Sequence, residues 1–177
     1  MKENLRFKRK PDSFQMTPAD VPYFLPASVA RDQDFIVQAQ LETMKLSYAS
    51  GASPYTHEHL HKLLDQAIRD PKHSIQVLFL GSRPIGYYWY EVRPKSVVFI
   101  LDLFVSERVR HQGFGNFLLQ TILVKAKSIS CTTAKLAVSV NNGAALSLYR
   151  NCGFTEVDAT TRGMTQWLEM ALDLRNT

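Results

Sequence analysis

The stretch Val97–Val105 constrains the fold more than any other part of the chain. Its sequence, V-V-F-I-L-D-L-F-V, is nine residues long with one polar interruption, Asp102. A run of this kind is typical of a strand covered on both faces, so we predict that it is the central strand of a sheet. Residues 113–129 then carry a helical apolar stripe, and residues 134–140 alternate apolar and polar side chains. Together they predict a βαβ unit with a parallel strand pair and a right-handed crossover.

Other segments predict further elements around this unit. Residues 1–27 contain four prolines and predict an irregular entry with at most one short strand. The remaining expectations are one or two helices over residues 28–48, a helix from the cap Thr56 to about residue 70, a hairpin of residues 75–80 and 85–92, a short helix over residues 144–151, a loop over residues 158–165 and a closing strand over residues 167–174.

The basic charge is concentrated at the start of the chain. The 177 residues carry 21 basic and 16 acidic side chains, a net charge of +5. Five of the basic and one of the acidic residues lie within the first ten positions, so the remainder carries only +1. We therefore predict a basic N-terminal arm, residues 1–10, and a single domain, residues 11–177. We favour a solvated terminus for the arm over contact with RNA phosphates, so nucleic acid is not the expected partner.

Cysteine usage and the first thirty residues predict a cytoplasmic protein. Cys131 and Cys152 are the only cysteines and form no C-x-x-C pair. This pattern favours a reducing compartment. Prolines and aspartates interrupt the apolar positions of residues 1–30, so they lack the core of a signal peptide. No stretch approaches the length of apolar sequence that a membrane span needs.

The segment after the central strand predicts an anion site. Gly113 and Gly115 lie where the strand passes into the long helix, and they allow a tight turn and a close approach of a ligand to the backbone. The first N–H groups of a helix lack carbonyl partners and favour negative charge, most often phosphate. The segment is neither a P-loop nor a dinucleotide fingerprint, because Leu118 stands where the third glycine of the latter belongs.

Two motifs in order resemble those of the GNAT N-acetyltransferase superfamily. The segment Arg110-His111-Gln112-Gly113-Phe114-Gly115 resembles the R/Q-x-x-G-x-G/A loop of that family. Residues 142–149, N-G-A-A-L-S-L-Y, with G-F at 153–154, resemble its N-x-x-A-x-x-L-Y…G-F helix. The resemblance covers roughly residues 75–174. It implies an α/β (α+β) fold of one GNAT-like domain, with a central mixed twisted sheet of about six to seven strands, helices on both faces and a splay between two parallel strands.

The resemblance also implies acetyl-CoA as co-substrate, without a metal. Pantetheine would pair with the central strand, the pyrophosphate would lie on the amides of the glycine loop, and an asparagine after the second parallel strand would contact the cofactor. A backbone amide near the end of the central strand would stabilise the oxyanion. The implied cofactor-binding residues are Leu103, Phe104, Val105, Arg110, His111, Gln112, Gly113, Gly115, Asn116 and Asn142.

Two side chains are the candidate catalytic groups. Tyr149 matches the family tyrosine that protonates the leaving thiolate, and the alternative is that it only packs beside the cofactor. Asp102 is the lone carboxylate of the apolar strand, and burial would raise its pKa and suit it as a base. Alternatively it is structural or binds the cationic amine. Relatives carry a glutamate slightly earlier, where Phe99, Ile100 and Leu101 stand here. A water chain or Glu91 could therefore be the base instead.

One segment matches a zinc-protease motif, and we interpret this match, called here the zinc-protease string, as coincidental. Residues 57–61 read H-E-H-L-H and match H-E-x-x-H, with His57 and His61 one helical turn apart. Leu64 stands where the longer metalloprotease form needs glycine, and no His, Asp or Glu lies between His73 and Glu91 to add a nearby ligand. We therefore predict no metal site.

These observations predict an acetyl-CoA-dependent N-acetyltransferase that moves an acetyl group by direct transfer to a primary amine of a small molecule or a protein. Two alternatives remain open: an acetyltransferase acting on aminoacyl-tRNA, with the basic arm on the phosphates, and a non-catalytic CoA-binding regulatory module. The sequence leaves the acceptor amine and a homodimeric state open.

Overall fold

The computed structural model describes residues 21–48 and 53–175. The basic arm, residues 1–10, lies outside these ranges. Within them, no helix has the length and apolar character needed to cross a bilayer. The elements in chain order are β1 (Tyr23–Pro26), α1 (Val29–Ser47), α2 (His57–Arg69), β2 (His73–Leu80), β3 (Arg83–Arg93), β4 (Val97–Val105), a 3₁₀ turn (Glu107–Val109), α3 (Phe114–Ser128), β5 (Thr133–Ser139), α4 (Gly143–Asn151), β6 (Thr155–Arg162) and β7 (Thr165–Asp173).

All seven strands form one mixed sheet in the order β1-β2-β3-β4-β5-β7-β6. The apolar strand β4 is the fourth of the seven, which confirms that it is central. Strands β4 and β5 are parallel, and every other neighbouring pair is antiparallel. The predicted α/β fold with one parallel pair around a crossover helix is therefore confirmed.

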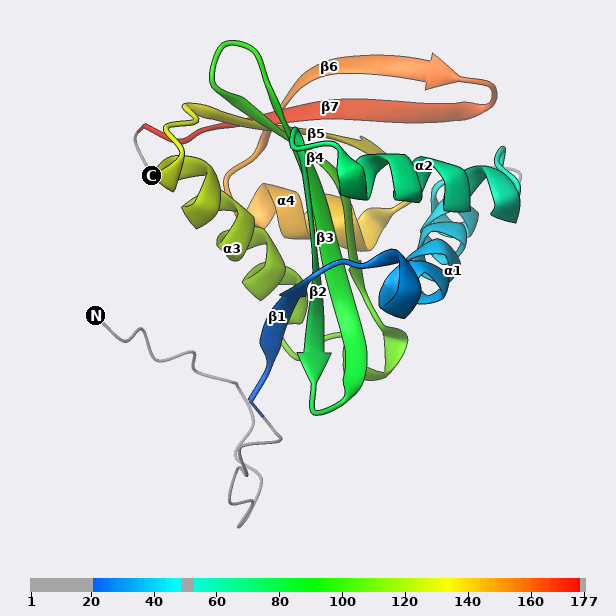
Figure 1. Cartoon of the computed structure of the whole chain (residues 1–177). Helices are drawn as coiled ribbons and strands as arrows, with labels where there is room; N and C mark the ends of the chain where they lie inside the picture. Colours follow the sequence, from blue (N-terminus) through cyan, green and yellow to red (C-terminus); the bar gives the residue numbers. More distant parts are fainter. Residues whose placement is uncertain (1–20, 49–52, 176–177) are drawn as a thin grey trace, which may run out of the picture.

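Helices cover both faces of this sheet (Figure 1). One core lies between the sheet and helices α3 and α4, and it includes Leu118, Ile122 and Leu136, all almost fully buried. The other lies between the sheet and helices α1 and α2, and it includes Ile36 and Leu64, both fully buried. Burial of both faces explains why β4 reads as an almost unbroken apolar run.

The parallel strands β4 and β5 separate towards their carboxyl ends. They pair only from Val97 opposite Thr133 to Ile100 opposite Leu136. Residues 101–105 of β4 and 137–139 of β5 continue as strands without pairing to each other. This is the predicted splay, and it leaves the backbone of β4 unpaired on that side.

A bulge in β4 lies at the start of the splay. In the pairing with β3, Tyr90 lies opposite Ile100 and Trp89 opposite Asp102, so Leu101 is an extra residue. One extra residue reverses the alternation of side chains beyond it. Val98 and Ile100 therefore face α3 and α4, and beyond the bulge Phe104 belongs to the core under α1 and α2. Asp102, two residues before Phe104, faces the same side.

The expected loop over residues 158–165 is wrong in part. Strand β6 occupies Thr155–Arg162, and only the turn at Gly163 and Met164 connects it to β7. All eight residues of β6 are exposed, so neither of its faces imposes an apolar alternation that the sequence could reveal.

The helices of the first half of the chain were predicted more closely. Residues 28–48, for which one or two helices were expected, form the single helix α1. The predicted cap is confirmed, because Thr56 Oγ1 accepts a hydrogen bond from the backbone N–H of His59 at 3.2 Å.

Candidate active site

Asp102 lies just beyond the bulge, on the α1 and α2 side of the splay. The hydroxyl of Tyr87 donates a hydrogen bond to its Oδ2. The carboxylate also accepts a hydrogen bond from the backbone N–H of Leu103. Burial raises the pKa of Asp102 to about 6, although these two hydrogen bonds to the ionised form act in the opposite direction. A carboxylate with this pKa can both accept and release a proton near neutral pH.

Tyr149 lies on α4, which covers the opposite face of the sheet. Its ring is buried and packs beside Phe154, with ring centroids 5.9 Å apart. Burial, and then the charges of Asp102 and Cys152, raise the pKa of Tyr149 above its ordinary value of 10. The phenol of Tyr149 is therefore fully protonated at neutral pH.

The glycine loop presents backbone amides at the N-terminus of α3. His111 and Gly113 both adopt left-handed backbone conformations, with φ angles of +61° and +90°. The first hydrogen bond of the helix runs from the N–H of Phe117 to the carbonyl of Gly113 at 3.0 Å. The N–H groups of Gly115 and Asn116 thus have no carbonyl acceptor within the helix. This geometry suits an anion.

The polar side chains expected to bind the cofactor make contacts within the protein. Arg110 donates through Nε to the carbonyl of Val105 at 3.1 Å, and its guanidinium also bonds to Glu42 on α1. Asn116 Oδ1 accepts from Cys152 Sγ at 3.2 Å, and Asn142 Oδ1 caps α4 by accepting from Ala145 N–H at 3.2 Å. The remaining contact of this kind joins Gln112 Nε2 to the carbonyl of Arg108 at 3.5 Å. These side chains therefore fix the shape of the loop and of the helix ends around it.

Other predicted residues lie along the unpaired part of β4 and where α3 approaches α4. Leu103 and Val105 pack against the core under α3, and Phe104 is buried in the other core. A Cβ on Gly115 would lie 3.4 Å from Leu148 Cδ2, so this glycine permits the close approach of α3 and α4. The structure thus brings the predicted strand, loop and helix residues together around the splay.

A pocket of about 500 Å³ opens on the α1 side of the carboxyl end of β4. Phe35 of α1 and Phe104 of β4 form part of its apolar wall. Glu42 and Arg108 contribute charge to its lining, and Glu42 is the partner of Arg110. The end of β4 is therefore accessible from the side on which Asp102 lies.

Tyr87 and Glu42 are the residues at this site that sequence reasoning missed. Tyr87 belongs to an aromatic run on β3, residues 87–90, whose alternation separates its two faces but gives no hint of a carboxylate partner. Glu42 lies 68 positions before Arg110, so no local pattern links them. The alternative base, Glu91 of β3, lies opposite Phe99 of β4. Its Oε1 accepts a hydrogen bond from Arg93 Nε at 2.5 Å.

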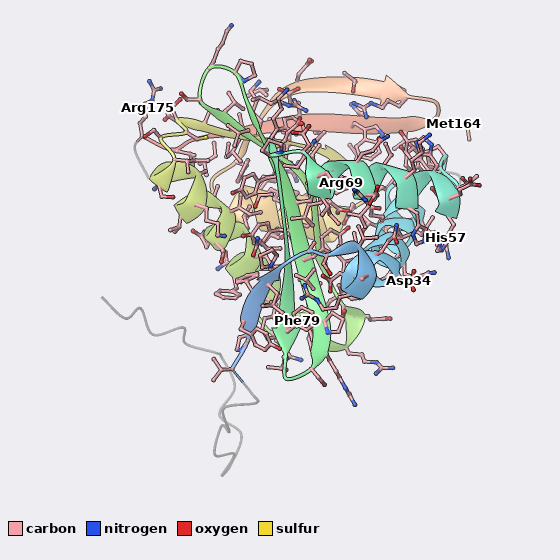
Figure 2. All side chains as sticks on the ribbon, viewed as in Figure 1. Asp34, His57, Arg69, Phe79, Met164 and Arg175 are labelled. Carbon is pink, nitrogen blue, oxygen red and sulfur yellow. The ribbon has the colours of Figure 1, made fainter. Side chains whose placement is uncertain are left out.

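Of the histidines in the zinc-protease string, His57 lies on the outside of the molecule at the start of α2 (Figure 2), His59 is also exposed, and His61 is half-buried. The rings of His57 and His61 are 5.4 Å apart, and His57 Nε2 contacts Gln38 Nε2 at 2.9 Å. The nearest carboxylate contact is Asp34 Oδ1, 3.9 Å from His61 Nε2. Across residues 21–48 and 53–175, no three or more His, Cys, Asp or Glu side chains are grouped so that they could hold a metal ion.

Solved structures with this architecture include several acetyltransferases. A spermidine N-acetyltransferase from Vibrio cholerae, in complex with CoA and spermine, has a TM-score of 0.70 at 20% identity, over 86% of this chain and 95% of that chain. The ribosomal-protein-S18-alanine N-acetyltransferase from Escherichia coli has a TM-score of 0.65 at 18% identity, over 87% of this chain and 94% of that chain. At these identities the likeness shows the fold.

Sequence comparison adds the family. The uncharacterized N-acetyltransferase YvbK of Bacillus subtilis (strain 168) is 32% identical over 68 residues, which is 38% of this chain and 43% of the length of that protein. The family model of the acetyltransferase (GNAT) family matches residues 38–154, more than half of the chain. On the strength of that match, the chain belongs to the acetyltransferase (GNAT) family, whose members are acetyl-CoA-dependent acyltransferases.

Proposed function

We propose that this protein transfers the acetyl group of acetyl-CoA directly to a primary amine. The observation that carries the proposal is the splay itself. It leaves residues 101–105 of β4 unpaired on the β5 side, with Asp102 on one face and Tyr149 on the other. A neutral acid and a carboxylate with a pKa of about 6 then flank one opening.

The residues present fit acetyl-CoA. Strand backbone without a partner can pair with the amides of pantetheine, and left-handed Gly113 directs the loop amides and the N-terminus of α3 towards an anion. We assign the strand contacts to Leu103, Phe104 and Val105. The loop contacts would come from His111, Gln112, Gly113, Gly115 and Asn116, with Arg110 and Asn142 holding the loop and α4 in place.

In this mechanism Asp102 accepts a proton from the acceptor ammonium, directly or through a water. When bound, acetyl-CoA supplies the acetyl group as an activated thioester. As the new N–C bond forms, the nitrogen would lose its second proton to solvent. Tyr149 would give its phenolic proton to the sulfur as the C–S bond breaks, and solvent would restore the proton of Tyr149. Each residue is in the required state near neutral pH, because the pKa of Asp102 is about 6 and that of Tyr149 lies above 10.

The comparisons do not identify the amine that accepts the acetyl group. The names of the two similar structures include a polyamine and a ribosomal protein as substrates, so both small-molecule and protein amines are represented on this fold. We propose a cytoplasmic location, which the two free cysteines, Cys131 and Cys152, support.

The test is calorimetry with acetyl-CoA followed by a free-thiol assay over a panel of amines. We expect binding of acetyl-CoA and thiol release that depends on the amine. Absence of acetyl-CoA binding would overturn the proposal. Binding without thiol release from any amine, with aminoacyl-tRNA included in the panel, would instead identify a CoA-binding module.

A further inference from the structure

Trp167, Ser139 and Asp102 lie on three adjacent strands and face the same side of the sheet. On β7, Leu168 and Met170 belong to the core under α3 and α4, so Trp167, which directly precedes Leu168, faces α1 and α2. Ser139 of β5 lies directly opposite Trp167 and donates through Oγ to the carbonyl of Ser47, at the end of α1, at 2.5 Å.

The register also gives the separation of Trp167 from Asp102. Continued past the bulge, the pairing of β4 with β5 brings Asp102 level with Ala137, two residues before the partner of Trp167. Two regular strand spacings and two residues along a strand would separate the two backbones by roughly 12 Å, and the splay of β4 from β5 makes this a lower bound. An elongated acceptor with its amine at Asp102 would therefore extend towards Trp167.

The indole nitrogen of Trp167 is buried, and among residues 21–48 and 53–175 it has no hydrogen-bond partner. Such groups are rare in native proteins, because a buried donor without an acceptor loses the hydrogen bonds that water would provide. An indole N–H can only donate, so the missing partner is an acceptor atom such as a carboxylate oxygen. Tyr48, just beyond α1, packs against the indole with ring centroids 5.5 Å apart and bounds this position on the helix side.

A cation lies beside this donor. The guanidinium carbon of Arg162, on β6, lies 5.5 Å from the centre of the Trp167 ring. Among residues 21–48 and 53–175, no carboxylate lies within ion-pair distance of Arg162. Glu169, two residues along β7, is instead paired with Lys135 at 2.7 Å. The hairpin of β6 and β7, with Met164 at its tip (Figure 2), thus brings an unpaired cation and an unpaired donor together.

Asp102 is the complementary group at the other end of this face. Among the described residues, its hydrogen-bond partners are the Tyr87 hydroxyl and the Leu103 amide, neither of which is a cation. The face therefore presents a negative group at the splay and a positive group beyond it. An acceptor with an amine at one end and a carboxylate at the other matches both, whereas the second cation of a polyamine would meet Arg162.

We propose that Trp167 and Arg162 bind a carboxylate of the acceptor, and that this enzyme acetylates aliphatic amines that carry a carboxylate at the far end of a spacer about as long as a lysine side chain. This inference rests on the proposed acetyl transfer and specifies its substrate class. Arg162 and the indole N–H would each donate to the carboxylate, and charge-assisted hydrogen bonds of this kind are the strong ones. The side chain of Arg162 is exposed, so a carboxylate from solvent can reach it.

The test compares 6-aminohexanoate with hexylamine, which has the same carbon count and amine but no carboxylate. With the full chain we expect a KM for 6-aminohexanoate about 10- to 100-fold lower than for hexylamine, the factor that one or two hydrogen bonds to a charged group provide. Arg162→Gln and Trp167→Phe should each raise the KM for 6-aminohexanoate about tenfold or more, with kcat and the KM for hexylamine unchanged. Arg69→Gln, the same charge change on exposed α2 (Figure 2), should alter neither KM.

Calorimetry of both probes with the CoA-saturated protein gives a second readout, independent of turnover. Equal affinity for the two amines, no binding of 6-aminohexanoate, or an Arg162→Gln variant that weakens both amines alike overturns the inference. Failure of the proposed function is separate, because it would appear as absent acetyl-CoA binding or absent thiol release with every amine.

Discussion

The hydroxyl of Tyr87 donates a hydrogen bond to the carboxylate of Asp102 across the pairing of β3 with β4. Tyr87 is fully buried and packs between Phe35 of α1 and Phe104 of β4, with ring centroids 6.3 and 6.1 Å from its own. The carboxylate is thus held by a side chain that itself has little freedom to move. This restricts Asp102 to a position at the start of the splay and prepares it to act on a bound amine.

The first prediction concerns the role of Asp102 as base. Because its pKa is about 6 and the ionised form is the active one, kcat/KM should rise with pH through about 6 and then level off. Asp102→Asn should lower kcat by roughly 10²- to 10⁴-fold, the contribution of one general base. The affinity for acetyl-CoA, measured by calorimetry, should stay the same.

Glu91→Gln is the matched control for that variant, because its carboxylate is engaged by Arg93. We expect it to retain the activity and the pH profile of the parent protein. The reverse result, with activity lost in Glu91→Gln and kept in Asp102→Asn, would transfer the role of base to Glu91.

A second prediction concerns Tyr87. Its hydrogen bond favours the ionised form of Asp102 and so lowers the pKa of that carboxyl against the effect of burial. Tyr87→Phe removes the hydroxyl and keeps the ring, so the rising limb of the kcat/KM profile should move to higher pH. A purely structural role would lower activity without moving the limb.

Tyr88→Phe is the control, because Tyr88 is equally buried on the neighbouring position but belongs to the other core. Its hydroxyl is buried and has no hydrogen-bond partner within the part of the chain that the structure describes. Removing it should leave the pH profile in place and should not reduce stability. If the rising limb of the kcat/KM profile moved in both Tyr87→Phe and Tyr88→Phe, the shift would reflect a general change in the sheet and not the loss of the hydrogen bond to Asp102.

The third prediction concerns Tyr149 as the acid. Its pKa lies above the ordinary value of 10, so loss of its proton should not produce a falling limb below about pH 10. Tyr149→Phe should lower kcat by about 10²-fold or more, with the affinity for acetyl-CoA unchanged. A variant that keeps full turnover would leave Tyr149 with a packing role beside Phe154.

Stability offers a fourth prediction that is independent of activity. The pKa of Asp102 is about 6 in the folded protein against an ordinary 3.8, so between these values the folded state binds more protons than the unfolded state. The contribution of this residue to the free energy of unfolding therefore falls as pH rises from about 4 to 6, by up to about 3 kcal/mol. Asp102→Asn cannot ionise and removes this dependence.

Urea unfolding of the parent protein and Asp102→Asn at several pH values from 4 to 8 measures this difference. The variant should gain stability relative to the parent as pH rises to 6, and the difference should be constant above it. A difference that does not vary with pH would mean that Asp102 is not penalised by burial.

Most of the fold could be predicted because the sheet is buried on both faces. The apolar run of β4, the helical stripe of α3 and the alternation of β5 each report directly on the faces that they bury. Strand β6 was missed because none of its eight residues is buried, so its pairing with β7 involves no buried side chain of β6. A strand of that kind carries no periodic signal.

The site could be predicted where a motif is local and not where it depends on register. Gly113, Asn142 and Tyr149 lie in short motifs, so their positions near the splay followed from the sequence. The contact of Tyr87 with Asp102 depends on the bulge at Leu101, which reverses the alternation of β4. No residue type in an apolar run marks a bulge, so the sequence contained no signal for this pair.

The last prediction concerns Arg110, which links the end of β4 to α1 through the Val105 carbonyl and Glu42. If Arg110 acts through this link, Arg110→Gln should raise the Kd of acetyl-CoA several-fold at both low and high salt. Salt screens interactions between charges, but it does not restore a loop whose geometry has changed. Arg108→Gln removes the same charge from the exposed turn, and its smaller effect should disappear at about 1 M salt, where the screening length is about 3 Å.

Glu42→Gln separates the two explanations, a structural link and direct electrostatic attraction, by the sign of its effect on the Kd of acetyl-CoA. Loss of a negative charge near an anion should tighten binding by electrostatics alone, whereas loss of the link should weaken it. We expect weaker binding by calorimetry, and tighter binding would instead mean that the guanidinium, once released from Glu42, contacts the anion directly.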